Sequence, residues 1–280
     1  MSPARVLSGR ELAAALREET TARAAALTAA GRPPRLAVVV ATADESSAWY
    51  VRSIARAAAA AGIVCDIHDL GPEASAAALR AELTRLGEDI AVHGVILQTP
   101  LPAGAALEDL ASAIPPGKDV DGANPVSLGR LAARLPAFAP ATAEAVVALL
   151  EHHGIEPAGR HVAVVGRSTV VGKPAALLLL DRDATVTVCH SRTPDLAGVT
   201  AAADIVVAAA GRPGLISAAH VRPGAVVIDV GTNPTPEGGL VGDVDAPSVM
   251  PHAGALTPVP GGVGPVTTAL LLQHVVRSAD

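Results

Sequence analysis

The sequence predicts an α/β protein of two domains, and three observations support this. The chain has 280 residues, long enough for two domains or for one large one. Short apolar runs alternate with helical stretches along most of it, as in parallel sheets whose strands are joined by helices. Residues 161–192 have the pattern strand, glycine turn, helix and strand, which is one βαβ unit.

The first half of the chain alternates strand and helix. The run Leu36–Ala41 is continuously apolar, which is typical of a strand buried on both faces. A helix at 8–30 precedes it, with Leu12 and Leu16 on one face, and the segment Gly31–Pro34 ends that helix. The further elements expected up to residue 125 are a helix from Ser46 or Ser47 to Ala61, a strand at 63–70, a helix at 75–86, a strand at 93–98, a helix at 106–113 and a loop at 115–125.

The second half repeats this alternation. Pro136 and Pro140, followed by a helix at 142–153, mark the expected junction between the domains. The elements expected after it are strands at 161–165 and 185–189 with a helix at 175–180 between them, strands at 205–209 and 225–230, a loop at 257–264 and a terminal helix at 265–279.

Composition excludes several classes of protein. The net charge is -6 with no basic patch, which argues against a nucleic-acid partner. No apolar run reaches the roughly 18–20 residues that span a bilayer, and the N-terminus lacks the apolar core of a signal peptide. Cys65 and Cys189 lie in apolar runs without metal-like spacing, so we expect core residues of a cytoplasmic protein. The histidines share no spacing, and we expect no metal site.

The turn after residue 165 predicts a nucleotide site. Gly166 and Gly172 let the backbone approach a pyrophosphate, and the following helix offers free N–H groups at its start. The turn is not a P-loop, because five residues separate the glycines and Pro174 follows the lysine. It is not a plain GxGxxG either, since Ser168 takes the middle glycine position. An ordinary strand–helix turn remains the alternative.

The second strand of this unit indicates the cofactor. It ends at His190-Ser191-Arg192, without the acidic residue that usually binds the ribose hydroxyl of NAD. A basic, hydroxyl-rich end suits a 2′-phosphate, and Arg167 could join Arg192 in binding it. We therefore favour NADP over NAD. Taken alone, Arg192 could also be a solvated loop charge.

Three further features suggest a second ligand. Gln98 ends its strand at the carboxyl edge of the sheet, where α/β proteins bind ligands. Asp121, in Lys-Asp-Val-Asp-Gly, offers a carboxylate to a cationic or amidine-like heterocycle, although the segment could be only a charged turn. The loop at 257–264 is rigid and glycine-lined, which suits either a domain linker or close packing against a ligand.

Together these motifs identify a family. GRSTVVGKP, VILQTPLP, KDVDG, Pro-x-Thr at 140–142, Asp-Val-Gly-x-Asn at 229–233 and TPVPGGVGP stand in order with matching spacing. The chain resembles the bifunctional methylenetetrahydrofolate dehydrogenase/methenyltetrahydrofolate cyclohydrolase family over nearly its whole length. The resemblance implies an N-terminal α/β folate-side domain at 1–139, joined by the C-terminal helix 266–280, and an NADP-binding Rossmann domain at 140–265. It also implies a folate cleft between the domains and a homodimer.

The resemblance assigns residues as well. It places Tyr50 over the pterin ring, Gln98 beside the reacting carbon and Asp121 at the pterin's amino edge. These are the expected catalytic residues, and Tyr50 and Asp121 also bind substrate. The expected cofactor residues are Gly166, Arg167, Ser168, Gly172, Ser191, Arg192 and Thr232, and the expected lining of the cleft includes Pro260, Gly261 and Gly262. Tetrahydrofolate one-carbon derivatives are the implied ligands, in one-carbon metabolism and purine biosynthesis.

One position departs from the family pattern, which has Tyr-Val-x-x-Lys. Ile54 stands where that lysine would be, four residues after Tyr50 and on the same helix face. In the family this lysine handles protons in the cyclohydrolase step. Arg52 and Arg56 face away, and arginine is a poor proton shuttle. We therefore expect a dehydrogenase with weak or absent cyclohydrolase activity.

Three alternatives remain open at the level of sequence. The chain could be a fully bifunctional dehydrogenase/cyclohydrolase. It could be a non-catalytic folate-binding paralogue, which Ile54 favours and the intact Tyr50, Gln98 and Asp121 disfavour. It could also be a two-domain dehydrogenase of a non-folate substrate, which the KDVDG and TPVPGGVGP loops disfavour.

Overall fold

The computed structural model describes residues 3–235 and 238–280, and the chain forms two compact units. The six-stranded unit comprises Met1–Ala13 and Thr142–Thr267, and the three-stranded unit comprises Ala14–Ala141 and Thr268–Asp280. Both are parallel α/β structures, which confirms the predicted fold class. Within the described residues, no helix is both long and apolar enough to cross a membrane.

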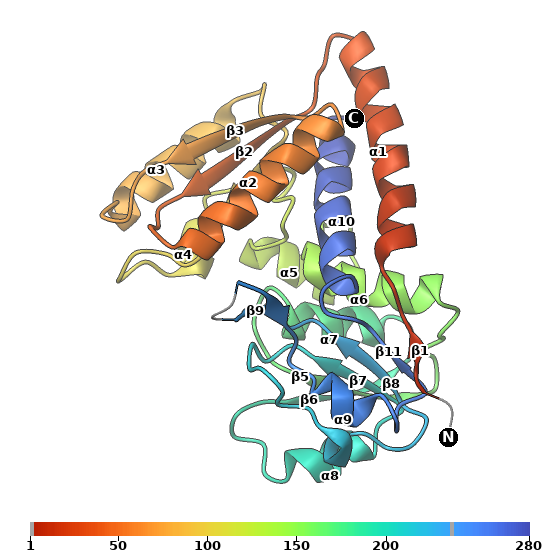
Figure 1. Ribbon diagram of the computed structural model, residues 1–280. Coiled ribbons are helices and arrows are strands. Elements are labelled where there is room, and N and C mark those ends of the chain that lie inside the picture. The colour runs from red at the N-terminus through yellow and green to blue at the C-terminus, as the bar shows by residue number, and fades with distance from the viewer. Residues whose placement is uncertain (1–2, 236–237) are drawn as a thin grey trace. The chain divides into compact units, whose positions relative to one another are not determined.

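The three-stranded unit is built around one central strand (Figure 1). β2 (Arg35–Val40) pairs in parallel with β3 (Val64–Asp69) on one side and β4 (Gly94–Leu97) on the other. Its residues from Leu36 to Val40 are all buried, as the continuous apolar run predicts. The helices that lie in this unit are α2 (Glu45–Ala60), α3 (Ala76–Glu88), α4 (Leu107–Ala111) and α5 (Pro125–Ala132), together with most of α1 (Arg10–Ala29) and the second half of α10 (Val263–Ser278).

The two faces of this sheet are covered by different helices. The face with Ala37 and Val39 packs against Leu79, Leu83 and Leu86 of α3, which recur at helical spacing. On the opposite face, Gly94 of β4 lies against Val275 of α10. α2 begins two or three residues earlier than expected, because Asp44 is its N-cap and accepts a hydrogen bond from Ser47 N.

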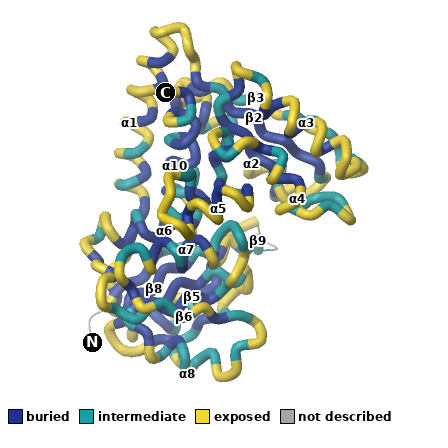
Figure 2. Tube along the Cα trace, turned by 180° about the vertical axis from the view of Figure 1, so that it is seen from behind, coloured by how far each residue is buried: buried dark blue, intermediate teal, exposed yellow. Residues whose placement is uncertain are grey.

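The six-stranded unit has the strand order β1-β11-β8-β7-β5-β6. The order changes direction at β5, because the next strand in sequence, β6, lies on one side of it and β7 lies on the other. Figure 2 shows β5 and β8 as buried strands. The bounds are β1 Arg5–Val6, β5 His161–Val165, β6 Thr185–Cys189, β7 Ile205–Ala208, β8 Val226–Asp229 and β11 Ala255–Leu256 for the sheet, β9 Asn233–Pro234 and β10 Leu240–Val241 for a small hairpin, and α6 Ala141–His152, α7 Gly172–Leu180, α8 Leu196–Ala201, α9 Ala246–Val249 and the 3-10 turn Ala218–His220 for the helices.

The first residues of the chain lie in the six-stranded unit, whereas residues 1–139 were expected to form one domain. β1 adds to the edge of that sheet by pairing in parallel with β11, with Arg5 opposite Ala255. Arg5 also donates to the carbonyl of His153, whose Nε2 contacts the carbonyl of Ser8. A strand of two residues carries no periodic signal, so the sequence could not indicate this pairing.

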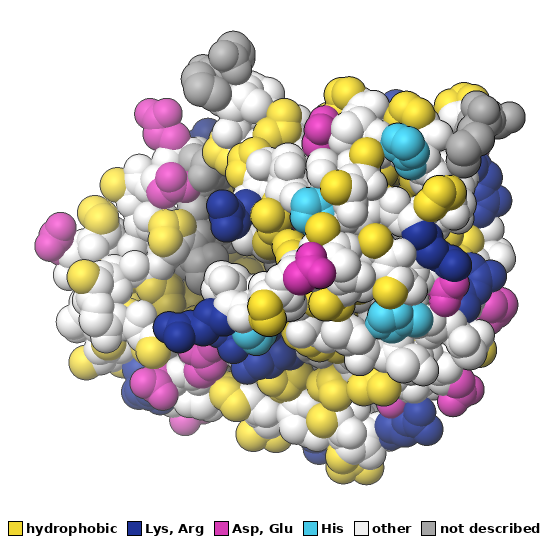
Figure 3. Space-filling model, turned by 90° about the horizontal axis from the view of Figure 1, so that it is seen from below, with side chains coloured by type: hydrophobic (Ala, Val, Ile, Leu, Met, Phe, Trp, Pro, Cys, Tyr) yellow, Lys and Arg dark blue, Asp and Glu magenta, His cyan; other side chains and the backbone are white. Residues whose placement is uncertain are grey.

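On the face drawn in Figure 3, surface charge is mixed: lysine and arginine side chains are interspersed with acidic ones. The ion pairs among the described residues include Arg35 with Asp66 at 3.2 Å and Arg222 with Asp204. Such exposed pairs contribute little to stability, typically about 0–1 kcal/mol.

Candidate active site

Tyr50 and Ile54 lie one turn apart on α2 but differ in exposure. Tyr50 is 36% exposed, whereas Ile54 is fully buried at 0%. Ile54 shares the inner face of the helix with Val51 and Ala58, which are also buried. The side chain at position 54 is therefore packed as part of an apolar face, and it offers no group that could carry a proton.

Gln98 follows β4 and is linked to the start of α2. Its backbone N–H donates to the carbonyl of Val39, which continues the β2–β4 pairing by one residue. Its side-chain amide donates to the carbonyl of Thr99 at 2.7 Å, and Ser47 Oγ donates to the same carbonyl at 2.9 Å. The carboxyl end of β4 is thus joined to the first turn of the helix that carries Tyr50.

Asp121 is the carboxylate of this unit whose ionisation is most strongly perturbed. Burial raises its pKa to about 7, and the nearby negative charge of Asp119 adds to the effect, while His274 opposes it. Burial also raises the pKa of Tyr50, with a further contribution from Asp121, so these two side chains share one electrostatic environment. Among the described residues, no hydrogen-bond donor reaches the Asp121 carboxylate, which suits a group that waits for a ligand.

The other charged residues of the Lys-Asp-Val-Asp-Gly segment are structural. Asp119 is fully buried, and it accepts hydrogen bonds from Ser127 Oγ at 2.6 Å and from the backbone N–H groups of Ala123 and Asn124 at 2.9 Å. Lys118 donates from Nζ to the carbonyl of Asp89 at 2.6 Å. These contacts fix the loop and leave Asp121 as its candidate ligand-binding side chain.

In the six-stranded unit, the glycine turn lies at the point where the strand order reverses. Gly166 has a φ of 133° and approaches the residue after β7 so closely that a Cβ would collide with the carbonyl oxygen of Ala209. A Cβ on Gly172 would collide with the carbonyl oxygen of Gly166. Both positions need glycine for a tight turn, and open α/β sheets bind ligands at such a reversal.

The polar residues predicted for the cofactor follow β5 and β6, which are neighbours in the sheet. Arg167 and Ser168 are exposed after β5, and Ser191 and Arg192 are exposed after β6. Ser168 Oγ also accepts the backbone N–H of Val171 at 3.1 Å. Arg167 and Arg192 thus follow the carboxyl ends of neighbouring parallel strands, and their role in binding a phosphate stays a prediction.

A pair of carboxylates organises the neighbouring loops: Asp229, which begins the quoted Asp-Val-Gly-x-Asn motif, and Asp243, which sequence reasoning did not single out. Asp243 is fully buried and accepts the backbone N–H groups of Ala210, Gly211 and Arg212 at 2.6–2.9 Å, together with Asn233 Nδ2 at 2.9 Å. Asp229, at the end of β8, accepts the N–H groups of Gly231, Asp243 and Val244 at 2.9–3.0 Å. The recurrence of Asp beside Gly at 229–231 and 242–243 was the available signal.

Thr232 and the loop at 257–264 complete the predicted set. Thr232 is exposed just after β8. Pro260 is exposed, whereas Gly261 and Gly262 are buried, and Gly261 accepts the N–H of Gly9 at 2.9 Å. Gly261 has a φ of 109°, and a Cβ on Gly262 would lie 2.7 Å from the carbonyl oxygen of Pro258, so the local backbone already accounts for these two glycines.

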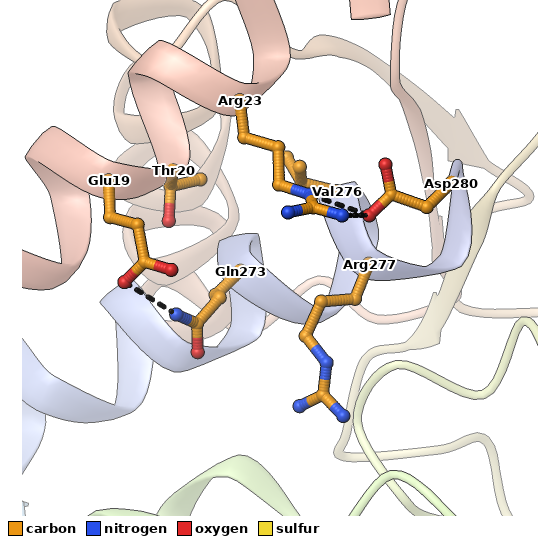
Figure 4. Close-up of a pocket in the computed structure, with 7 residues that line it drawn as sticks. All are labelled: Glu19, Thr20, Arg23, Gln273, Val276, Arg277 and Asp280. Carbon is orange, nitrogen blue, oxygen red and sulfur yellow. Dashed lines mark hydrogen bonds and ion pairs between the residues drawn. The ribbon is translucent and has the colours of Figure 1, made fainter.

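A separate polar groove lies between α1 and α10 in the three-stranded unit (Figure 4). Glu19 accepts from Gln273 at 3.4 Å, and Arg23 pairs with Asp280. None of the predicted site residues lines this groove. Across the described part of the chain, no cluster of three His, Cys, Asp or Glu side chains could hold a metal ion.

Fold and site together define a class of protein: a two-unit parallel α/β protein with a dinucleotide-type turn in one unit and a perturbed carboxylate in the other. Comparison with known proteins identifies the family. The family model described as the NAD(P)-binding domain of tetrahydrofolate dehydrogenase/cyclohydrolase matches residues 140–280, and that of the catalytic domain matches residues 7–121. The chain belongs to the tetrahydrofolate dehydrogenase/cyclohydrolase family, and on that membership we assign it methylenetetrahydrofolate dehydrogenase activity.

Individual relatives agree with this assignment. The chain is 68% identical over 279 residues to the bifunctional protein FolD 1 of Saccharopolyspora erythraea, covering 100% of this chain and 95% of that protein. It is 65% identical over 275 residues to the bifunctional protein FolD 1 of Rhodococcus jostii, covering 98% and 93%. Among solved structures, the methylenetetrahydrofolate dehydrogenase-cyclohydrolase of Trypanosoma brucei, complexed with NADP and an inhibitor, has a TM-score of 0.94 and 42% identity, covering 100% and 98%.

Proposed function

We propose that the chain oxidises 5,10-methylenetetrahydrofolate to 5,10-methenyltetrahydrofolate, with NADP⁺ accepting the hydride. Asp121 carries the folate half of this proposal, because a partly exposed carboxylate with a raised pKa and no internal donor suits the amino edge of a pterin. Tyr50 shares its electrostatic environment and covers the ring. Gln98, at the end of β4, lies beside the reacting carbon.

The residues present fit NADP. Arg167 and Arg192 are exposed after neighbouring strands, and no acid lies in the turn from His190 to Arg192 to repel a 2′-phosphate. Gly166 and Gly172 have no side chain, so a pyrophosphate could approach the backbone closely at the start of α7. When bound, the nicotinamide ring accepts a hydride, that is, one proton and two electrons.

The reaction needs positioning more than proton transfer. The methylene carbon loses a hydride, and the product is a methenyl cation whose charge is spread over the two flanking nitrogens. No proton leaves in this step, so the chain must chiefly hold two reactants at the right distance. Tyr50, Gln98 and Asp121 can do so without a lysine at position 54.

Purified protein supplied with 5,10-methylenetetrahydrofolate and NADP⁺ should therefore form NADPH. Asp121→Asn should lower kcat/KM for the folate at least tenfold, because a charged hydrogen-bond acceptor contributes about 1.5–3 kcal/mol. Glu73→Gln, a similar change at an exposed position, should have no effect. A wild-type trace that does not rise above the blank would refute the dehydrogenase proposal.

We further propose that the second family reaction, hydrolysis of the methenyl cation to 10-formyltetrahydrofolate, is weak or absent. Ile54 supports this because it is apolar, fully buried and unable to move a proton. Losing a general acid–base group costs typically about 10²–10⁴-fold in rate. The bifunctional names of the relatives favour the alternative that both activities survive.

The rate at which methenyltetrahydrofolate decays with the protein, compared with its rate in buffer alone, distinguishes weak or absent cyclohydrolase activity from the alternative that both activities survive. The wild type should show little enzymatic decay, and Ile54→Lys should gain it. Ile54→Met is the matched control, since it has a flexible side chain of similar length but no charge. Rapid decay with the wild type would mean that another group activates the water, and equal rates in both variants would exclude a specific role for the ammonium.

A homodimer is the remaining proposal. β6 is an edge strand of the six-stranded sheet, and Val188 on it is 40% exposed, so its unpaired edge could meet a second copy. Light scattering during gel filtration should give about twice the 27.8 kDa of one chain. A mass of one chain at micromolar concentration would contradict this proposal.

A further inference from the structure

Helix α10 holds the loop that carries Asp121, although the two are far apart in sequence. His274 is fully buried, and its Nδ1 lies 2.8 Å from the carbonyl oxygen of Val120, the residue immediately before Asp121. Because a carbonyl oxygen can only accept, Nδ1 carries the proton and donates it. One turn further along α10, Ser278 Oγ lies 2.7 Å from the carbonyl of Gly117 and 2.6 Å from that of His93.

The imidazole is itself fixed from the other side. Phe138, the only phenylalanine in the chain, stacks on it with ring centroids 4.9 Å apart. The guanidinium of Arg277 lies 5.5 Å from the centroid of the Phe138 ring. The imidazole of His274 is therefore held by a hydrogen bond through Nδ1 and by a ring packed against it, so its orientation is fixed.

Val120 leaves little freedom to the loop. Its two γ-methyl groups and a γ-methyl group of Val275 would each be 3.0 Å from a Cβ placed on Gly94, so these side chains pack directly over β4. Asp119, one residue earlier, is tied down by its own hydrogen bonds to the start of α5. Because these neighbours are fixed, the hydrogen bond from His274 to the Val120 carbonyl can set the orientation of the peptide between Val120 and Asp121.

We propose that His274 is a positioning residue for the folate substrate: by donating Nδ1–H to the Val120 carbonyl, it fixes the direction in which the Asp121 carboxylate points. This inference rests on the proposed role of Asp121 in binding the substrate. It assigns His274 no contact with the substrate and no part in hydride transfer. A change at His274 should therefore alter affinity for the folate and leave affinity for NADP⁺ unchanged.

Two amide substitutions separate positioning from general stability. Asparagine places its Nδ2 donor where histidine has Nδ1, whereas glutamine places its donor one atom further out. His274→Asn should keep KM for 5,10-methylenetetrahydrofolate within about threefold of the wild type, and His274→Gln should raise it about tenfold or more. In both variants KM for NADP⁺ should stay within about twofold. Thermal unfolding of both variants should be measured, because both lose the stacking on Phe138 and should lose similar stability.

Ser278→Ala is the matched control on the same helix. It removes the contact with Gly117, four residues from Asp121, and should leave both KM values within about twofold. Equal folate KM values for His274→Asn and His274→Gln would overturn the inference, and so would a parallel rise in KM for NADP⁺. A wild type without dehydrogenase activity would refute the proposed function instead, so the two failures are distinguishable.

Discussion

The Asp243 carboxylate offers the sharpest test of how the six-stranded unit holds its cofactor loops. Its Oδ2 accepts the N–H groups of Ala210 and Gly211 at 2.6 and 2.8 Å, and its Oδ1 accepts Arg212 N and Asn233 Nδ2, both at 2.9 Å. Asp243→Asn keeps the shape of the side chain but replaces one of these acceptors with a donor. Whichever way the amide turns, two of the four hydrogen bonds are lost.

The expected cost follows from those two bonds. Hydrogen bonds to a charged group contribute about 1.5–3 kcal/mol each, so the loss is about 3–6 kcal/mol. Part of it is offset because Asp243 lies beside Asp229, whose pKa is raised to about 6, first by burial and then also by the Asp243 charge. Removing that repulsion stabilises the fold by roughly 1 kcal/mol, so the net loss in the free energy of unfolding is about 2–5 kcal/mol.

Urea unfolding of the wild type and the variant measures this directly, and KM for NADP⁺ gives the functional consequence. Residues 210–212 follow β7 at the reversal of strand order, so KM for NADP⁺ should rise while KM for the folate changes little. Asp245→Asn is the control, because it makes the same change in charge at a side chain without a capping hydrogen bond. A loss below about 0.5 kcal/mol for Asp243→Asn, the usual size of a surface effect, would refute this reading.

Three other predictions concern single residues. The pKa of Asp121 is raised to about 7, so kcat/KM for the folate should rise with pH through about 7. For the same reason Asp121 destabilises the fold progressively as the pH rises from about 4 to about 7, and fully above that. Asp121→Asn should therefore unfold at a higher temperature than the wild type at pH 8 and at the same temperature at about pH 4. A flat profile with unchanged unfolding at pH 8 would contradict this. Arg192→Ala should raise KM for NADP⁺ about tenfold or more and leave KM for NAD⁺ unchanged, and an equal rise for both cofactors would exclude a role at the 2′-phosphate. Gly166→Ala should abolish NADP⁺ binding, because its Cβ would collide with the Ala209 carbonyl oxygen. Gly159→Ala is the control: its Cβ would have no atom within 4 Å, so the variant should lose only about 1 kcal/mol of stability. Retained NADP⁺ binding by Gly166→Ala would show that the turn can relax.

Sequence reasoning succeeded where structure depends on local pattern. The strands at 161–165 and 185–189 have the predicted bounds, because the first is an apolar run between turns and the second alternates Thr with Val between turns. The same pattern gave the central strand near Leu36 and the helix that follows it. Cap positions were less certain: Asp44, rather than Ser46 or Ser47, caps α2, since several polar residues in a row can each accept the same N–H groups.

Residues whose role depends on distant partners could not be predicted. His274 contacts a carbonyl 154 positions away, and Asp243 receives three backbone N–H groups from residues 31–33 positions earlier. The sequence around His274 gives no sign of its partner, and the recurrence of Asp beside Gly at 229–231 and 242–243 does not indicate which N–H groups Asp243 accepts. The helix α5 was also missed, although its start carries a local signal: Asn124 is the N-cap, accepting Val126 N, and Pro125 is the first helical residue.

Ile54 shows how one reaction could be lost without disturbing the other. A lysine at this point of α2 would bring a long apolar stem and one charge, and isoleucine keeps an apolar contact with the face of Val51 and Ala58 while removing the charge. The other contacts of this unit are independent of it: Ser47 and Gln98 both donate to the Thr99 carbonyl, and His274 donates to the Val120 carbonyl beside Asp121. Under the proposed function, hydride transfer depends on those contacts, whereas opening the methenyl cation needs a group that moves a proton. On that proposal, a single buried side chain would separate the two reactions without a change in fold.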